Sequence, residues 1–415
     1  MSGEGLRRRQ QGARGRVVER EESETEKVHT SIGWFKAGLI STGLTFLVLP
    51  VVLWFIPSPI DPVSYTLPTP PQWTGPLKPN THLQKATKLF LGEVKGAESM
   101  VSDGEYMYTG TADGRIMEIY KGQIRELTRL GVPPCGRFED EPTCGRPLGM
   151  RIDADGYLIV ADAYLGLFKV NVATGDKTVL WPSTAPINGR QPKFFNDLDI
   201  DSDGTIYLSE SSTKWDRRHN RYCILEAETS GRLIAYNPDT NTTEELVTGI
   251  PFANGVQITR DKKAILLVST TQAAVHKYHL EGSKKGQLET FNNNLPGLPD
   301  NIRRSSLGGY WVGMATVRKP GKSMVDFSSR RPWLRRFITK ILSQETIIKY
   351  MSANYGLVVH LNEEGEITRT LHDPSGNKIP AVSEVEDRGG QLYFGSYYLP
   401  YISKLYLSDV KDVPS

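Results

Sequence analysis

Short apolar segments separated by polar turns recur along most of the chain. In each of six units a short hydrophobic segment leads into a turn of the form Asp/Ser-x-x-Gly, and an apolar strand that ends in small residues follows. The units begin at Ala97, Pro147, Phe195, Ala253, Pro299 and Val382. Strand-length runs rich in Val, Ile, Leu and Tyr dominate them, and helical periodicity is nearly absent. The pattern therefore predicts an all-β fold.

The spacing of equivalent positions in these units predicts the architecture. Aligning the unit starts places one residue of each in a single column: Glu98, Leu148, Asn196, Asn254, Asp300 and Ser383. Successive members lie 50, 48, 58, 46 and 83 residues apart. Apart from the last, these spacings match four-stranded propeller blades of about 40–50 residues. We therefore expect a six-bladed β-propeller over residues 80–411.

One long apolar run precedes the repeats. Residues 37–56 contain no charge and are about as long as a helix needs to be to cross the hydrocarbon core of a bilayer. A cleaved signal peptide has a shorter apolar stretch close to the first residue, whereas this run follows 36 mostly polar residues. We predict a disordered cytosolic tail over 1–36, a transmembrane signal-anchor helix over 37–56 and a Pro-rich linker over 57–79. A buried core helix is the alternative to the span.

The charges on either side of the apolar run indicate its orientation. Eight basic residues and six glutamates precede it, whereas Asp61 is the only charged residue between Ile56 and Lys78. The positive-inside rule then predicts a single-pass type II protein of the plasma membrane or endoplasmic reticulum, with the propeller extracellular or lumenal. A net charge of only +3 argues against a nucleic-acid partner.

The cysteines and one sequon agree with an oxidising compartment. Cys135 and Cys144 enclose a short polar loop, so we expect a disulfide between them, with Cys223 left over as a buried or free thiol. Three cysteines are too few for a Cys-based zinc site without histidine help. Asn241 begins an Asn-Thr-Thr sequon in a polar turn and is a candidate glycosylation site.

The column itself carries the candidate chemistry. The innermost strands of a propeller line its central channel, so equivalent positions from different blades converge on one axis. Carboxylate and amide oxygens gathered there suit Ca²⁺, which takes about 6–8 oxygen ligands in irregular geometry. The candidate ligands are Glu98, Asn196, Asn254, Asp300 and the adjoining Asn301. Asn and Asp also occur as ordinary turn residues at strand entries, but four oxygen donors at one register favour a metal site.

Three insertions are expected to overhang the candidate metal site, on the face of the propeller where the inner strands begin. The loop between Cys135 and Cys144, residues 211–230 in the third blade and residues 318–354 in the fifth all fall on that side. We interpret residues 215–219 as a solvated loop, with lining of the substrate pocket as the alternative. Residues 318–354 contain the one helical candidate downstream of residue 57, a basic amphipathic helix with an apolar stripe formed by Trp333, Leu334, Phe337, Ile338, Ile341 and Leu342. It is either a lid packed on the propeller or a lid that also touches the membrane surface.

The order Glu, Asn, Asn, Asp-Asn in the column resembles the strictosidine synthase-like, paraoxonase and gluconolactonase group. Proteins of this group are six-bladed propellers with calcium in the central channel, and the resemblance implies calcium ligands at the five residues named above. The N-terminal anchor and the motifs PCGRFEDEPTCGRPLGMR, FFNDL, FANGVQ, LPDNIR, GGYWVGM and SQET are similar to those of a membrane-anchored member of the group.

The proton-transfer groups of these families are not carried over. The position that matches the first paraoxonase histidine is Leu148, and the second falls near Ala163. The catalytic glutamate of strictosidine synthases corresponds to Ser383, with Glu384 beside it and expected to face away. Leu148 and Ser383 are therefore expected to line the pocket.

Two functions of different classes remain. The first is a membrane-anchored Ca²⁺-dependent hydrolase of small aryl esters or lactones, in which the metal polarises the carbonyl and activated water attacks. Glu98 and Asp300 are then the candidate water-activating carboxylates. The second is a non-catalytic, membrane-anchored propeller with structural calcium that acts as an interaction or receptor-like protein. An accessible cavity at the ion favours the first, and a site sealed by residues 318–354 favours the second.

Overall fold

The computed structural model describes residues 34–36, 42, 48, 51–52 and 55–410. The chain divides into two units, Met1–Ser58 and Pro59–Ser415. Most of the predicted span at 37–56 lies outside the described residues. Within the described part of the chain, no helix is long and apolar enough to cross a bilayer.

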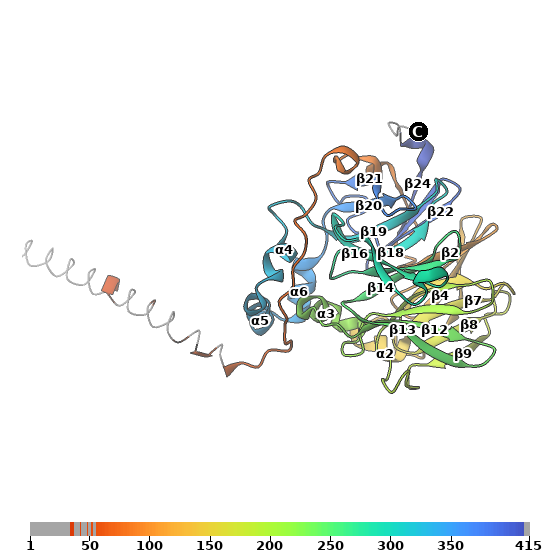
Figure 1. Ribbon diagram of the computed structural model, residues 1–415, viewed down its shortest axis with the longest axis horizontal. Helices are drawn as coiled ribbons and strands as arrows, with labels where there is room; N and C mark the ends of the chain where they lie inside the picture. The colour runs from red at the N-terminus through yellow and green to blue at the C-terminus, as the bar shows by residue number, and fades with distance from the viewer. Residues whose placement is uncertain (1–33, 37–41, 43–47, 49–50, 53–54, 411–415) are drawn as a thin grey trace, which may run out of the picture. The chain divides into compact units, whose positions relative to one another are not determined.

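The second unit is a six-bladed β-propeller, as the repeat predicts (Figure 1). Each blade is an antiparallel four-stranded sheet, and the innermost strands of neighbouring blades pack against one another around the full ring. The first three blades comprise β2 (Met100–Asp103), β3 (Tyr106–Gly110), β4 (Arg115–Tyr120) and β5 (Gln123–Arg129); β6 (Pro147–Ile152), β7 (Leu158–Asp162), β8 (Gly166–Val170) and β9 (Lys177–Pro182); and β10 (Phe195–Ile200), β11 (Ile206–Glu210), β12 (Gly231–Asn237) and β13 (Thr242–Ile250).

The sixth blade closes the ring with strands from both ends of the unit. Strand β1 (Thr87–Leu89) pairs antiparallel with β24, so the first strand of the propeller is the outermost strand of the last blade. The other strands of the last three blades are β14 (Ala253–Ile258), β15 (Ala264–Ser269), β16 (Ala274–His279) and β17 (Leu288–Asn292); β18 (Gly297–Arg304), β19 (Tyr310–Val317), β20 (Gly356–Leu361) and β21 (Ile367–Asp373); and β22 (Glu384–Arg388), β23 (Gln391–Gly395) and β24 (Ile402–Tyr406).

Two glycines allow neighbouring inner strands to approach closely at the head of the channel. A Cβ on Gly149 would lie 2.5 Å from the Cα of Asp197, and one on Gly255 would lie 2.8 Å from the Cα of Asn301. Both glycines directly follow a column residue. Their missing side chains therefore let the column residues of adjacent blades come together.

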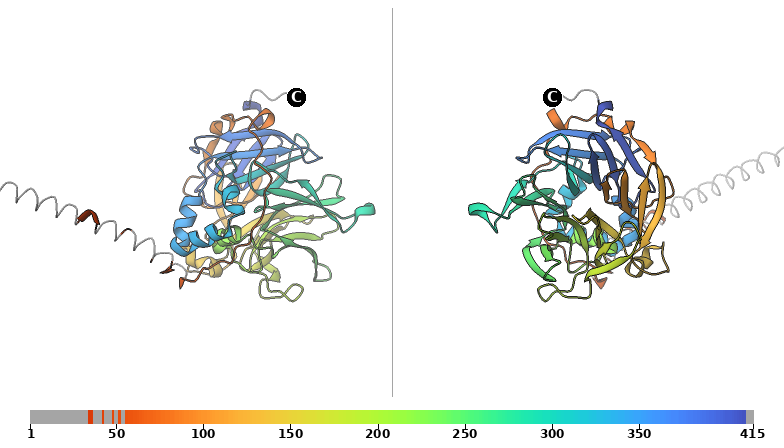
Figure 2. Two further views of the ribbon diagram at one scale, coloured as in Figure 1. Left: turned by 60° about the vertical axis from the view of Figure 1, so that its left-hand side comes forward. Right: turned by 90° about the vertical axis from the view of Figure 1, so that its right-hand side faces the viewer.

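The α-helices of the propeller unit lie mainly on one side of the blades (Figures 1 and 2). The fifth blade carries the predicted helical insertion between β19 and β20 as three short helices: α4 (Met324–Ser329), α5 (Pro332–Ile341) and α6 (Gln344–Met351). The third blade contributes α3 (Asn220–Glu226), and α2 (Glu141–Cys144) joins the first two blades. The 3₁₀ turns are η1 (Gly75–Leu77), η2 (His82–Lys85), η3 (Phe138–Asp140), η4 (Arg217–His219), η5 (Gly282–Lys284) and η6 (Leu407–Asp409).

The cysteine pairing is as predicted. Cys135 and Cys144 form a disulfide that closes the loop carrying η3 and α2. Cys223 is a free thiol buried in α3.

Candidate functional site

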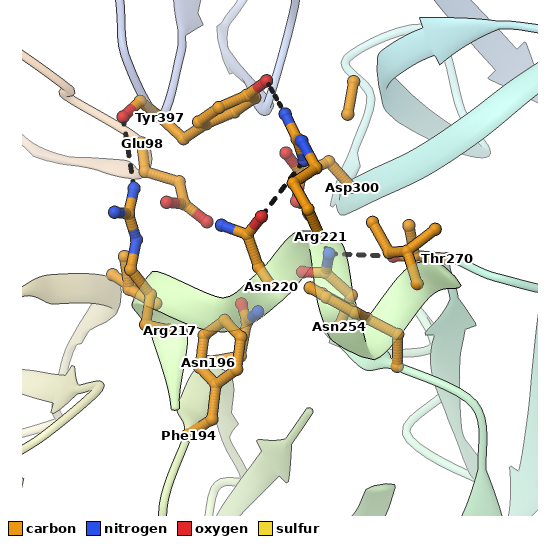
Figure 3. Close-up of a pocket in the computed structure, with 14 residues that line it drawn as sticks. Glu98, Phe194, Asn196, Arg217, Asn220, Arg221, Asn254, Thr270, Asp300 and Tyr397 are labelled. Atoms are coloured by element: carbon orange, nitrogen blue, oxygen red, sulfur yellow. Dashed lines mark hydrogen bonds between the residues drawn. The ribbon is translucent and has the colours of Figure 1, made fainter. Parts of the chain in front are cut away.

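A small cavity lies where the inner strands begin. Five of the six column residues line it, namely Glu98, Leu148, Asn196, Asn254 and Asp300 (Figure 3). Its volume is ≈ 40 Å³. A buried water needs about 10–15 Å³ of such space, so the cavity accommodates an ion with a few waters but no aryl ester.

Three buried amides on the inner strands share one hydrogen-bonding pattern. The Nδ2 of Asn196 donates to Ser211 Oγ at 2.9 Å, and that of Asn254 donates to Thr270 Oγ1 at 2.9 Å and to Asp300 Oδ1 at 2.8 Å. Asn301, next to Asp300 in sequence, does not line the cavity; its Nδ2 donates to a carboxylate oxygen of Glu384 at 3.3 Å.

Each of these amide groups is therefore held by its nitrogen. The Oδ1 atoms of Asn196, Asn254 and Asn301 are all buried without a hydrogen-bond partner. Because a buried oxygen without a partner costs free energy, three at one end of the channel point to a bound cation or water.

Two buried carboxyls complete the set. Burial raises the pKa of Glu98, with Arg146 and Arg217 acting in the opposite direction. Burial also raises the pKa of Asp300, and the charge of Glu98 raises it further. Two like charges in so small a space repel each other, and a divalent cation bound between them would remove that repulsion.

The donor chemistry fits a hard cation. The part of the chain that the structure describes holds no cluster of three or more His, Cys, Asp or Glu side chains suited to a metal. The set is instead two carboxylates with three amide oxygens, which is chemistry that Ca²⁺ accepts and Zn²⁺ does not favour.

The remaining column positions differ in role. Leu148 lines the cavity and belongs to an apolar cluster that includes Ala163, Phe194 and Phe252. Ser383 is not among the lining residues; its hydroxyl hydrogen-bonds to the carboxyl of Asp300 and accepts from Tyr397 N at 3.0 Å. The serine therefore supports the site from outside the cavity, and the wall formed by Leu148 and its neighbours is apolar.

Glu384 faces away from the cavity, as the strand alternation predicts. Its carboxylate accepts from Ser99 Oγ at 2.8 Å and from Met100 N at 2.6 Å, and it forms an ion pair with Arg303. The last blade therefore supplies no free carboxylate to the cavity.

The sequence analysis expected residues 211–230 to overhang the site but did not identify the side chains that cap the cavity. Arg217, Asn220, Arg221 and Ile224 of the third-blade insertion line the cavity together with Tyr397 (Figure 3). The interpretation of residues 215–219 as a solvated loop is wrong for Arg217, which is buried. The order of the strands predicts that this insertion overhangs the site. Which of its side chains line the cavity depends on packing between distant segments, which the sequence does not show.

Polar contacts fasten this cap on two sides. Arg217 Nη1 donates to Glu141 Oε1 at 2.7 Å, which joins the cap to the loop closed by the disulfide. Arg221 Nη2 donates to the hydroxyl oxygen of Tyr397 at 2.6 Å, which joins it to the sixth blade.

The fifth-blade insertion lies outside the cap and does not line the cavity. Helices α5 and α6 both contact α3, and Ile338 and Ile347 pack with Leu225 of that helix. The cover therefore has two layers: an inner one from the third blade and an outer one from residues 324–351.

Comparisons with known proteins agree with this architecture. Residues 196–283 match the family model described as strictosidine synthase, and residues 75–119 match that of the strictosidine synthase-like N-terminal region. The adipocyte plasma membrane-associated protein of Salmo salar is 45% identical over 371 residues, which cover 89% of this chain and 89% of that protein. The strictosidine synthase-like 3 protein of Arabidopsis thaliana is 34% identical over 358 residues, covering 82% and 90%.

Solved structures show the same fold at much lower sequence identity. A gluconolactonase from Xanthomonas campestris superposes with a TM-score of 0.54 at 13% identity and covers 83% of this chain and 98% of that one. This likeness concerns the fold alone.

Proposed function

Since the chain belongs to the adipocyte plasma membrane-associated protein family, within the strictosidine synthase-like group, we propose that it is a membrane-anchored Ca²⁺-dependent hydrolase of small aryl esters or lactones. The observation that carries this proposal is the group of three unpartnered amide oxygens beside two buried carboxyls. The ligands would be Glu98, Asn196, Asn254, Asp300 and Asn301. When bound, calcium would supply a Lewis acid that polarises the carbonyl group of the substrate.

The residues of the chain would divide the remaining tasks. Asp300 is engaged by Asn254 and Ser383, whereas Glu98 lies 3.8 Å from Arg146 Nη2. We therefore assign to Glu98 the role of accepting a proton from the attacking water. Leu148 and its apolar neighbours would hold the acyl or aryl group and exclude bulk water.

The membrane location is part of the same proposal. The names of the relatives associate them with the plasma membrane. For this chain we propose a cytosolic tail over 1–36, a span over 37–56 and an extracellular or lumenal propeller. The disulfide between Cys135 and Cys144 and the exposed position of Asn241 support that side of the membrane.

The closed cap favours a second candidate function. An aryl ester does not fit a cavity of ≈ 40 Å³, so the first function requires the cap of Arg217, Arg221 and Tyr397 to move. If the cap stays closed, calcium would only tie the blades together, and the propeller would serve as an interaction or receptor-like protein.

Hydrolysis of phenyl acetate and of a small lactone by the full-length protein distinguishes the two functions. The hydrolase predicts activity that a calcium chelator abolishes and added Ca²⁺ restores. Activity that survives chelation would contradict a calcium-dependent hydrolase. Absence of hydrolysis, together with a melting temperature that rises with Ca²⁺, would favour the structural role. Leu148→Met removes no ligand and should therefore keep the rise in melting temperature that Ca²⁺ causes.

A further inference from the structure

Helix α5 exposes an apolar ridge that the packing of the propeller does not use. Trp333, Phe337 and Ile341 follow one another at intervals of four residues and are 66%, 39% and 48% exposed. Residues four apart share one side of a helix. The neighbouring ridge faces inward, where Ile338 and Leu342 pack against a small core cluster. The apolar stripe predicted from the sequence is therefore two ridges, of which only one holds the helix in place.

Helix α4 extends the exposed ridge. Met324 and Phe327 are also largely exposed, and α4 contacts α5 directly. We call the surface made by Met324, Phe327, Trp333, Phe337 and Ile341 the insertion face. Large apolar side chains gathered on adjacent helices mark an interaction surface more often than single exposed ones do.

The charge around the insertion face is strongly positive. Residues 318–351 contain nine Lys and Arg against two acidic residues, whereas the whole chain has 50 against 47. Two of the nine are buried: Arg318 pairs with Asp326, and Arg335 donates to the carbonyl oxygen of Leu225 at 2.6 Å. The rest lie outside the fully buried core. Aromatic and apolar side chains interleaved with basic ones match a phospholipid surface, where rings enter the headgroup layer and cations meet lipid phosphates.

The segment at the start of the propeller unit is attached to helix α5. Asp61 forms an ion pair with Arg336 of α5, the carbonyl of Val63 accepts from Arg335, and Tyr65 N donates to Ser329 O at 3.2 Å. Asp61 follows Ile56 by five positions, a reach of at most about 18 Å. With residues 37–56 in a bilayer, α5 cannot be far from its surface.

We propose that the insertion face docks on the phospholipid surface of the membrane in which the protein is anchored. Trp333, Phe337 and Ile341 enter the headgroup layer, and the surrounding basic residues contact lipid phosphates. The cap helix α3 contacts α5, so docking of α5 also determines which side of the cap faces the bilayer. The proposal rests on the membrane anchor and needs neither calcium nor hydrolysis.

The test uses the full-length protein reconstituted in vesicles of phosphatidylcholine, with and without phosphatidylserine. An environment-sensitive fluorophore is attached through Ile341→Cys, or through Leu307→Cys as a matched control. Leu307 is 49% exposed and lies in the turn between β18 and β19, at the other end of the inner strand. The native Cys223 is buried, so labelling is confined to the introduced thiol.

Brominated lipid should quench the label at 341 several-fold more than the label at 307, and chelating calcium should leave that difference unchanged. Adding Trp333→Asp and Phe337→Asp should reduce the quenching at 341 without lowering the melting temperature, because both side chains are exposed. Equal quenching at both positions would overturn the proposal. A second outcome would also overturn it. If brominated lipid did not quench the label at 341, but the label became less exposed to solvent as the protein-to-lipid ratio rose, the insertion face would be a contact between copies of the chain. Failure of the full-length chain to associate with vesicles would overturn both docking and the anchor.

Discussion

Arg303 of the fifth blade binds Asp197 of the third blade through two parallel hydrogen bonds, Nη1 to Oδ2 at 2.7 Å and Nη2 to Oδ1 at 2.8 Å. Both side chains are buried, and the fourth blade lies between theirs in the ring, so the pair joins inner strands that are not neighbours. Arg303 also pairs with Glu384 of the sixth blade. One guanidinium therefore neutralises two buried carboxylates, one of which directly follows the candidate ligand Asn196 in sequence.

Removing this cation should destabilise the propeller. Arg303→Met leaves two buried carboxylates without their partner, so we expect the free energy of unfolding to fall by about 3–5 kcal/mol. Lys121→Met is the control, because Lys121 pairs with Glu105 and both side chains are mostly exposed, so its loss should cost at most about 1 kcal/mol. Thermal and denaturant unfolding measure both. If both variants lost the same free energy of unfolding, the buried ion pairs of Arg303 would contribute no more to stability than an exposed pair does.

Calcium binding should depend unequally on the five candidate ligands. Asp300→Asn and Glu98→Gln each remove one of two negative charges, so calcium affinity should fall by about tenfold or more, equivalent to about 1.4 kcal/mol. Asn254→Ala removes a neutral ligand and should weaken binding less. Titration calorimetry of the full-length protein in detergent measures these affinities, with Leu148→Met as the variant that should bind normally. If Asp300→Asn bound calcium as tightly as the wild type, the proposed calcium site would be wrong.

Loosening the cap should widen substrate access if the protein is a hydrolase. Tyr397→Phe removes the hydroxyl that accepts from Arg221, so the cap should open more readily and kcat/KM for bulkier aryl esters should rise. Tyr398→Phe is the neighbouring control, because the Tyr398 hydroxyl donates to Ala353 O and the side chain does not line the cavity. A rise of the same size in both variants would argue against a gating role for Tyr397.

Glycosylation of Asn241 tests the orientation of the chain. Asn241 is exposed in the turn between β12 and β13, which the strand order puts at the end of the third blade away from the cavity. In cells, an endoglycosidase should lower the apparent mass of the wild-type chain but leave that of Asn241→Gln unchanged. A propeller that is open to protease from the cytosolic side of sealed vesicles would contradict the predicted topology.

Removing the disulfide should weaken the fold and its cap. The bond between Cys135 and Cys144 closes a short loop, so Cys135→Ser should lower the free energy of unfolding by about 2–3 kcal/mol. That loop also carries Glu141, the partner of Arg217. Hydrogen exchange at residues 217–226 should therefore rise in Cys135→Ser, and unchanged protection there would show that the cap does not depend on the loop.

The sequence by itself determined the propeller, the disulfide and the set of residues that meet at the head of the channel. The equivalent positions from Glu98 to Asp300 could be aligned from the sequence because every blade repeats the same short-range pattern of strand and turn. Once strands of known order form a ring, equivalent positions must converge, whatever else the chain does.

The tertiary structure alone decided which side chains close that site and which remain outside. Arg217 and Tyr397 come from segments 180 residues apart, and Arg303 finds partners in two other blades. On α5, Ile338 and Phe337 are adjacent and equally apolar, yet one packs inward and the other faces solvent. Local pattern sets the elements, but burial of a given side chain depends on what distant segments bring against it, and that follows only from the packed fold.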